Sequence, residues 1–156
     1  MTDDARFPPK AGTIAELLTR IDDAWRQLHA ALDGMPEERL EEPGVTGDWS
    51  IKDLCGHLAL WDENAAQQIP RVLAGQDRAE ADFQALNDED HARRRERPLP
   101  EQRSAMEQAH ADLIDQLQAI AGADAAAMDH AINVDTYLHY DEHRAEIETW
   151  RRQQGI

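Results

Sequence analysis

Apolar residues recur every three or four positions in four separate segments of this chain, a spacing that matches the 3.6-residue period of an α-helix. A helix with one apolar stripe must bury that stripe against a neighbouring element. β-Branched residues are sparse, whereas Ala, Leu, Glu, Gln and Arg, which favour helices, are abundant. The sequence therefore predicts an all-α fold.

Two capping patterns mark where the first two helices begin. Thr13 followed by Glu16 matches a capping box, and Gly34 provides a stop after the first apolar stripe. Ser50 and Asp53 both favour the positive end of a helix dipole, so the second helix is expected to start there.

The second half of the chain is harder to divide. Pro70 either ends or kinks the second helix, or is followed by a short extension to Leu73. We predict an antiparallel four-helix bundle with a long crossover between helices 2 and 3, formed by residues 1–156 as a single domain. The elements expected after the second helix are a solvated crossover with one short helix (75–100), a third helix (100–122), a loop (121–133) and a fourth helix (133–153).

The charge and the single cysteine restrict the partners and the location of the protein. Lys and Arg number 16 against 32 Asp and Glu, giving a formal charge of −16, which repels phosphate backbones and anionic lipids. Neither nucleic acid nor a membrane is therefore expected as a partner, and no apolar run reaches the roughly 20 residues of a membrane span. The first ten residues lack a secretory signal. Cys55, which is expected to be a small buried thiol, excludes an internal disulfide and fits a cytoplasmic location.

Three histidines are expected to face a common interior. His139 and His143 are four residues apart in the fourth predicted helix, so their side chains project from one face, on a stripe that continues into apolar residues. His57 lies on the apolar stripe of the second helix. A divalent transition metal would satisfy three imidazole acceptors together and keep coordination positions for water or substrate. Three imidazoles suit zinc, nickel, copper and iron alike.

A different interpretation of the same residues is that each is a hydrogen-bonded core histidine, because an H-x-x-x-H pair is common in helices. The remaining histidines lack comparable placement and are interpreted as surface or structural residues. They are His29, His91, His110 and His130.

Two segments resemble a known family. "GDWSIKDLCGHLALWDE" resembles the second-helix signature of the DinB/YfiT-like four-helix bundles, in which G-x-W-S leads into a helix carrying H-L-x-x-W. "YLHYDEHRAEIETW" is similar to the fourth-helix H-x-x-x-H segment of that superfamily, and the resemblance covers nearly the whole chain. It implies that His57, His139 and His143 form a metal triad, with zinc or nickel as the ion, and that the protein is a homodimer.

The resemblance also implies a function. Relatives such as mycothiol-dependent maleylpyruvate isomerase and thiol S-transferases use a low-molecular-weight thiol, which implies a metal-dependent enzyme acting on a small molecule as a thiol-dependent transferase or isomerase, or as a hydrolase. A branch resembling the colibactin self-resistance protein shares the bundle but is not known for a histidine triad, so the three histidines point away from it. The alternative is a non-catalytic stress-response protein that binds a metal or a small ligand.

Other side chains near the triad have two interpretations each. Asp53 and Asp135 lie one turn before a candidate ligand, where they either orient its ring or remain solvated caps. Asp141 and Glu142 are expected to face away from the site, and Trp49 to pack over it. Further candidates to reach a bound substrate are Asp62, Glu63, Tyr137 and Tyr140, with packing as the alternative for the tyrosines.

Overall fold

The computed structural model describes residues 7–156, and its regular elements are all helical, which confirms the predicted fold class. The predicted absence of a secretory signal falls largely on residues 1–6, outside the described part. No helix in that part combines the length and apolar character needed to cross a bilayer. The elements are α1 (Ile14–Leu32), a 3-10 turn (Glu37–Arg39), α2 (Ile51–Leu73), α3 (Phe83–Arg94), α4 (Leu99–Gln118), α5 (Ala125–Ile132) and α6 (Tyr137–Gln154).

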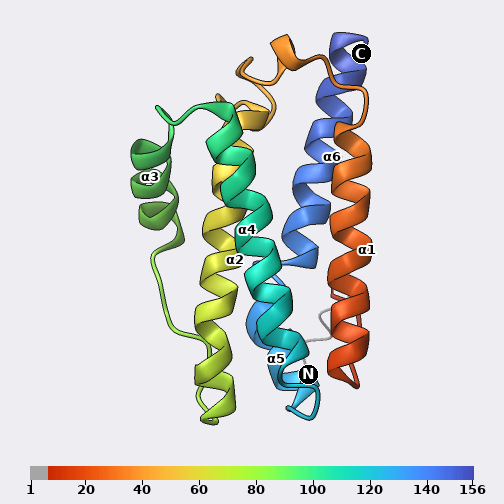
Figure 1. The fold of residues 1–156 in the computed structure, drawn as a ribbon, viewed down its shortest axis with the longest axis vertical. Coiled ribbons are helices and arrows are strands. Elements are labelled where there is room, and N and C mark those ends of the chain that lie inside the picture. The colour runs from red at the N-terminus through yellow and green to blue at the C-terminus, as the bar shows by residue number, and fades with distance from the viewer. Residues whose placement is uncertain (1–6) are drawn as a thin grey trace.

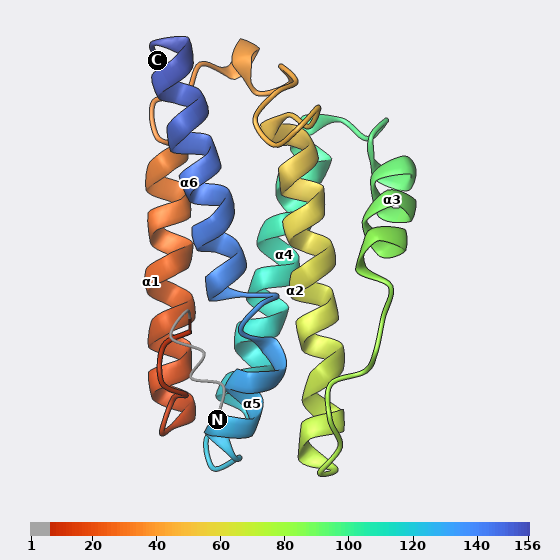
Figure 2. The same ribbon diagram turned by 180° about the vertical axis from the view of Figure 1, so that it is seen from behind.

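Four long helices form the body of the molecule (Figure 1), with α1 packed against α6 and α2 against α4. The crossover after α2 carries the chain back along the outside of the bundle, so α2 and α4 run in one direction and α1 and α6 in the other. The short helix predicted in the crossover is α3, which lies beside α2 on the flank of the bundle (Figures 1 and 2). This places α3 next to the face that carries the candidate site.

The predicted start of α2 is confirmed in detail. The Ser50 hydroxyl accepts a hydrogen bond from the Asp53 amide, and the Asp53 carboxylate accepts one from the Ser50 amide, which completes a capping box. The helix continues through Pro70 to Leu73, as one of the alternatives required. At α1, Thr13 caps the helix, but the Glu16 carboxylate accepts a hydrogen bond from the Gly12 amide rather than from Thr13.

The prediction of a loop over residues 121–133 is wrong, because that segment contains α5. The Asp124 carboxylate accepts a hydrogen bond from the Ala127 amide and caps the new helix, while Met128 and Ile132 are fully buried on its inner side. The fourth predicted helix accordingly begins later, at Tyr137. The apolar face of α5 closes the end of the bundle that the shorter α6 leaves open (Figure 2).

A glycine in the second turn of α2, Gly56, allows α3 and α4 to approach closely. A Cβ at Gly56 would lie 2.6 Å from Oε1 of Gln102 and 3.0 Å from Cδ of Arg94. Both side chains are buried, and Gln102 donates a 2.7 Å hydrogen bond to the Arg94 carbonyl, so neither can move at low cost. The absence of a side chain at Gly56 is therefore a packing requirement.

Gly56→Ala is expected to lower the free energy of unfolding by about 1–3 kcal/mol, because overpacking outweighs the gain in helix propensity. Urea denaturation of the two proteins measures the difference. Gly122→Ala is the control, since its Cβ would meet nothing within 4 Å, and a change within about 0.5 kcal/mol is expected there. Equal effects at both positions would contradict the packing argument.

Candidate metal centre

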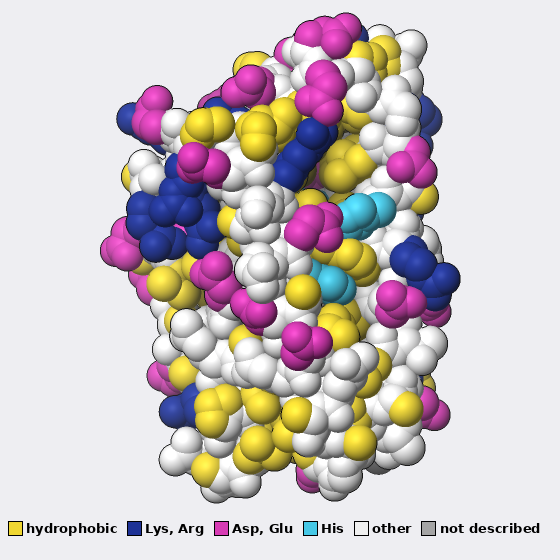
Figure 3. Space-filling view, viewed as in Figure 1, with side chains coloured by type: hydrophobic (Ala, Val, Ile, Leu, Met, Phe, Trp, Pro, Cys, Tyr) yellow, Lys and Arg dark blue, Asp and Glu magenta, His cyan; other side chains and the backbone are white. Residues whose placement is uncertain are grey.

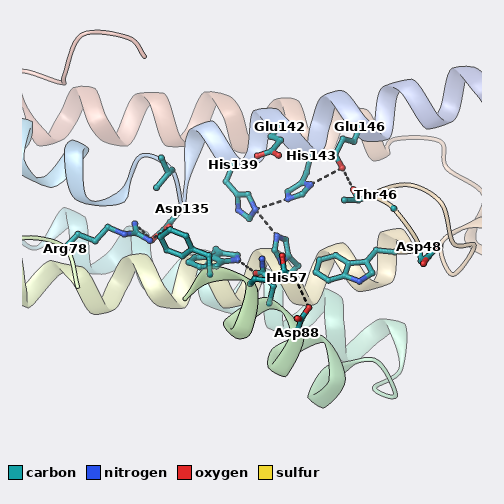
Figure 4. Close-up of a pocket in the computed structure, with 17 residues that line it drawn as sticks. Thr46, Asp48, His57, Arg78, Asp88, Asp135, His139, Glu142, His143 and Glu146 are labelled. Atoms are coloured by element: carbon teal, nitrogen blue, oxygen red, sulfur yellow. Dashed lines mark hydrogen bonds and ion pairs between the residues drawn. The ribbon is translucent and has the colours of Figure 1, made fainter. Parts of the chain in front are cut away.

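Three imidazole rings from two helices meet at one point between α2 and α6 (Figure 4). Nε2 of His139 lies 3.0 Å from Nε2 of His57 and 2.8 Å from Nε2 of His143. Within residues 7–156, these three buried side chains form the group of His, Cys, Asp or Glu residues whose ligand atoms are close enough to hold a metal ion. The structure thus brings together the three histidines that the sequence singled out.

The contacts between the three rings are poorly satisfied by three neutral imidazoles alone. A neutral ring nitrogen carries either one proton or one in-plane lone pair. Nε2 of His139 therefore has one group to serve two neighbours that are both within hydrogen-bond distance. A cation placed among three lone pairs would satisfy all three nitrogens at once, and metal–nitrogen bonds of roughly 2.0–2.1 Å are compatible with the observed separations. The donor set fits a divalent transition metal.

Burial keeps two of the rings, those of His57 and His139, in the neutral form that such an ion requires. Desolvation, assisted by the neighbouring His143, lowers the pKa of His57 to about 3. The pKa of His139 is also lowered well below its usual value, first by desolvation and then by the two other rings. Neutral imidazoles offer their lone pairs without first releasing a proton.

A carboxylate supports one of the three rings from behind. Oε2 of Glu146 lies 3.4 Å from Nδ1 of His143, and the same carboxylate accepts a hydrogen bond from the Thr46 hydroxyl (Figure 4). The adjacent His143 ring lowers the pKa of Glu146. A carboxylate against the far nitrogen of a ligating histidine fixes the orientation of the ring. Sequence reasoning missed Glu146, although its position three residues after His143 was a usable signal.

The triad opens into a cavity of about 560 Å³. Trp49 and Trp61 form aromatic walls, with ring centroids 4.9 and 6.5 Å from the His57 ring, so the expected packing of Trp49 over the site is confirmed. The outer wall comes from α3, where Asn87 accepts a 2.8 Å hydrogen bond from the Trp61 indole. No local sequence pattern indicates that the crossover helix lines this cavity, because that contact depends on how α3 packs against α2.

The other candidates separate into clear groups. Asp53 is a helix cap, whereas Asp135 is buried and held by two hydrogen bonds from Arg78 and one from Asn64, so it is not a solvated cap. Glu142 borders the cavity, and the expectation that it faces away is wrong because its turn of α6 faces the mouth.

Four side chains proposed to reach a substrate are engaged elsewhere, because the core and the α2–α3 contact hold them. Asp62 accepts a hydrogen bond from Tyr140, Asp129 accepts one from Tyr137, and Glu63 pairs with Arg94. Cys55 is buried as expected, and desolvation raises the pKa of its thiol to about 12.

The lowered histidine pKa values predict an acid-sensitive metal-free protein. Between about pH 6.5 and pH 3 the unfolded chain binds a proton at His57 that the folded chain does not, so stability falls as the pH falls. Each such group contributes a slope of up to about 1.4 kcal/mol per pH unit in that window. Urea denaturation with a chelator present should give a shallower slope for His57→Ala than for wild type, and an unchanged slope for the exposed His130→Ala. Parallel slopes in all three proteins would contradict the burial argument.

Comparison with known proteins places this arrangement in a family. The model of the mycothiol maleylpyruvate isomerase N-terminal domain matches residues 14–152. The chain belongs to this family. The resemblance to the DinB/YfiT-like superfamily is thereby confirmed, while no curated protein matches the sequence.

Several solved structures share the fold of this protein although their sequence identity to it is low. An uncharacterised protein from Escherichia coli UTI89 is 16% identical, with 94% of this chain and 97% of that chain covered and a TM-score of 0.76. The sibling lethal factor precursor DfsB is 16% identical over 93% and 98% of the two chains, with a TM-score of 0.73. The colibactin self-resistance protein ClbS, solved in complex with dsDNA, is 12% identical over 89% and 95%, with a TM-score of 0.71.

The exclusion of nucleic acid as a partner is wrong as an argument from net charge. ClbS has the same fold and was solved with dsDNA, so a bundle of this kind does not by itself exclude nucleic acid. Net charge is a sum over the whole molecule, whereas binding depends on the local distribution. Figure 3 shows Lys and Arg side chains gathered on the side of α3 despite the total of −16.

Proposed function

We propose that the protein is a metal-dependent enzyme that acts on a small molecule through His57, His139 and His143. The observation that carries this proposal is the convergence of three Nε2 atoms, at 2.8 and 3.0 Å, beside a cavity of about 560 Å³. A purely structural histidine cluster would have no use for an adjacent cavity of ligand size. A divalent ion, zinc or nickel, would supply a Lewis acid that lowers the pKa of a bound thiol or water.

The side chains around the triad have separate roles in this proposal. Glu146, held by Thr46, orients the His143 ring. Trp49 and Trp61 exclude water from the inner end of the cavity and provide apolar contact for the substrate. The Arg78–Asp135 pair fixes the connection between α5 and α6, from which His139 projects one turn later.

Thiol transfer has stronger support than hydrolysis. A hydrolase needs a carboxylate that is free to take a proton from water. Asp135 is bound by Arg78, and Glu146 is engaged by Thr46 and His143. Asp88 and Glu142 also border the cavity, but they are exposed at its mouth, where a carboxylate is solvated by water. A thiol releases its proton more readily than water does, so it has less need of such a base. The family's name, which refers to mycothiol, supports a low-molecular-weight thiol as co-substrate.

The experiment uses protein purified without an affinity tag and loaded with zinc, nickel or cobalt. Metal content is measured first, and a panel of low-molecular-weight thiols and electrophiles is then assayed with and without a chelator. Turnover that is lost with the chelator and restored by metal supports the enzyme. Stoichiometric metal without turnover supports the second candidate, a non-catalytic metal- or ligand-binding stress-response protein. A protein that binds no metal would exclude both.

The homodimer and the cytoplasmic location also belong to this proposal. The dimer is supported by the resemblance to the family, and the location by the single cysteine, Cys55. Light scattering at several protein concentrations tests the dimer.

A further inference from the structure

The cavity beside the triad has an uneven distribution of charge. Five carboxylates border it. Four of them, from three elements, are not paired with Arg78: Asp48 from the loop before α2, Asp88 from α3, and Glu142 and Glu146 from α6 (Figure 4). Among residues 7–156, no Lys or Arg forms an ion pair within 4.0 Å with any of these four groups. The mouth of the cavity therefore carries negative charge that no Lys or Arg of residues 7–156 neutralises, although Glu146 contacts His143 and Thr46 and Asp88 accepts a hydrogen bond from Gln84.

Among the described residues, 7–156, Arg78 is the single Lys or Arg of the cavity wall, and it is already engaged. Nη1 and Nη2 of Arg78 donate hydrogen bonds of 2.7 and 2.8 Å to the two carboxylate oxygens of Asp135, and Nη1 also donates to the carbonyl of Ala131 at 2.9 Å. This bidentate pair neutralises Asp135 and engages both terminal nitrogens of Arg78. An anionic ligand would meet the four remaining carboxylates without gaining a salt bridge.

The end of the cavity near Arg78 is apolar. Phe83, at the start of α3, is 50% exposed, and Val134, in the connection between α5 and α6, is 45% exposed. The ring of Trp61 lies 5.4 Å from that of Phe83 and continues the same wall toward the triad. Exposed apolar side chains that line a cavity mark contact with a ligand more than with solvent.

We propose that the cavity takes a small cationic molecule, a thiol with an amine on a partly apolar body, and discriminates against anionic thiols. This inference rests on the proposed function for the thiol that reaches the triad. The amine would face the ring of carboxylates, and the apolar part would contact Trp61, Phe83 and Val134. Low-dielectric walls concentrate the field of the carboxylates inside the cavity, so the preference is stronger there than at an open surface.

Asp88 and Glu142 are the specificity-determining residues to test. Both are exposed at the mouth, on opposite walls formed by α3 and α6. Glu146 is unsuitable because it supports His143. The double variant Asp88→Asn with Glu142→Gln removes two charges from the mouth. The matched control, Glu89→Gln with Asp141→Asn, removes two charges from the neighbouring positions, neither of which lines the cavity.

The first measurement uses the cobalt-loaded protein, whose visible absorption changes when a thiolate binds. Affinities are measured for cysteamine, 2-mercaptoethanol and mercaptoacetate, which are cationic, neutral and anionic. In wild type the order is expected to be cationic, then neutral, then anionic. The ratio between cysteamine and mercaptoacetate is expected to fall by about tenfold in the double variant and to change little in the control. Differences in intrinsic thiol pKa cancel, because the same thiols are compared across the proteins.

The second measurement is independent of metal and thiol. In the metal-free protein, tryptophan quenching by iodide and by caesium, each normalised to acrylamide, reports the charge around Trp49, the most exposed of the four tryptophans. Iodide is expected to quench poorly and to improve in the double variant but not in the control. If no thiol binds to the cobalt-loaded protein, the proposed function fails, but the quenching experiment still tests whether the cavity is negatively charged. Equal access for both ions, or anionic thiols that bind as tightly as cationic ones, would overturn the inference.

Discussion

Replacing any one of His57, His139 or His143 with alanine is expected to weaken binding of a divalent transition metal by more than about 100-fold. Removing a residue that only supports a ligand can already cost about 100-fold, and removing the ligand itself should cost more. The three Nε2 atoms meet at one point, so each substitution removes a ligand and leaves two. The measurement is a competition titration against a chromophoric chelator, combined with metal analysis of the purified variants.

The control for this experiment is His29→Ala. His29 is a histidine of the same bundle, but its ring contacts the Trp25 carbonyl and the Glu107 carboxylate on α4, away from the triad. Metal occupancy should stay at the wild-type level in this variant. Equal losses at His29 and at the triad would indicate nonspecific binding, and an absence of metal from well-folded wild-type protein would return the three rings to the role of core histidines.

The histidine cluster was predictable because each of its parts is encoded locally. The i, i+4 spacing of His139 and His143 fixes their common face, and the apolar stripes of α2 and α6 fix which way all three rings point. The capping residues at Ser50 and Asp53 set where α2 begins. A helical period together with the burial of its apolar stripe is therefore sufficient to bring His57 to the other two rings.

The rest of the site depends on contacts between distant segments. Glu142 was expected to face away from the site but borders the cavity, and Asp62 was expected near its mouth but is fully buried. Both predictions were wrong because a residue at the edge of a helical stripe can face either neighbour, and the spacing alone does not decide which. The position of α3 depends on the close approach of Arg94 and Gln102 to Gly56. No local sequence pattern predicts this contact. The helix α5 was missed because eight residues with one flanking glycine resemble a connection, although Asp124 had the chemistry of a cap.

Behind the triad, a buried polar network joins the same two helices. Asp62 on α2 and Tyr140 on α6 are both 0% exposed, and the Tyr140 hydroxyl donates a hydrogen bond to Oδ1 of Asp62. Nδ1 of His110 lies 3.4 Å from Oδ2 of Asp62, and its ring stacks on Trp25 at 3.7 Å. Burial raises the pKa of Asp62, and the nearby His110 ring and the hydrogen bond from Tyr140 counteract that rise.

Tyr140→Phe is therefore expected to lower the free energy of unfolding by about 3 kcal/mol near neutral pH, because it removes a donor from a buried carboxyl group. The loss should be smaller in acid. Without Tyr140 the pKa of Asp62 rises further, so the folded state gains a proton that the unfolded state lacks at pH values above about 3.9. The difference in the free energy of unfolding between wild type and Tyr140→Phe therefore increases as the pH rises. Urea denaturation of wild type and variant, once near neutral pH and once in acid, measures the difference in the free energy of unfolding under each condition.

Tyr137→Phe provides the matched comparison, since the Tyr137 hydroxyl also donates to a buried carboxylate on a neighbouring helix, that of Asp129. Asp129 keeps two other donors, the Ala11 amide at 2.7 Å and Nη1 of Arg20 at 3.1 Å. The same deletion should cost only about 1 kcal/mol there, because the carboxylate remains solvated by the protein. If the two variants lose equal stability, or if the loss at Tyr140 is the same in acid, then the α2–α6 connection does not depend on the charge of Asp62.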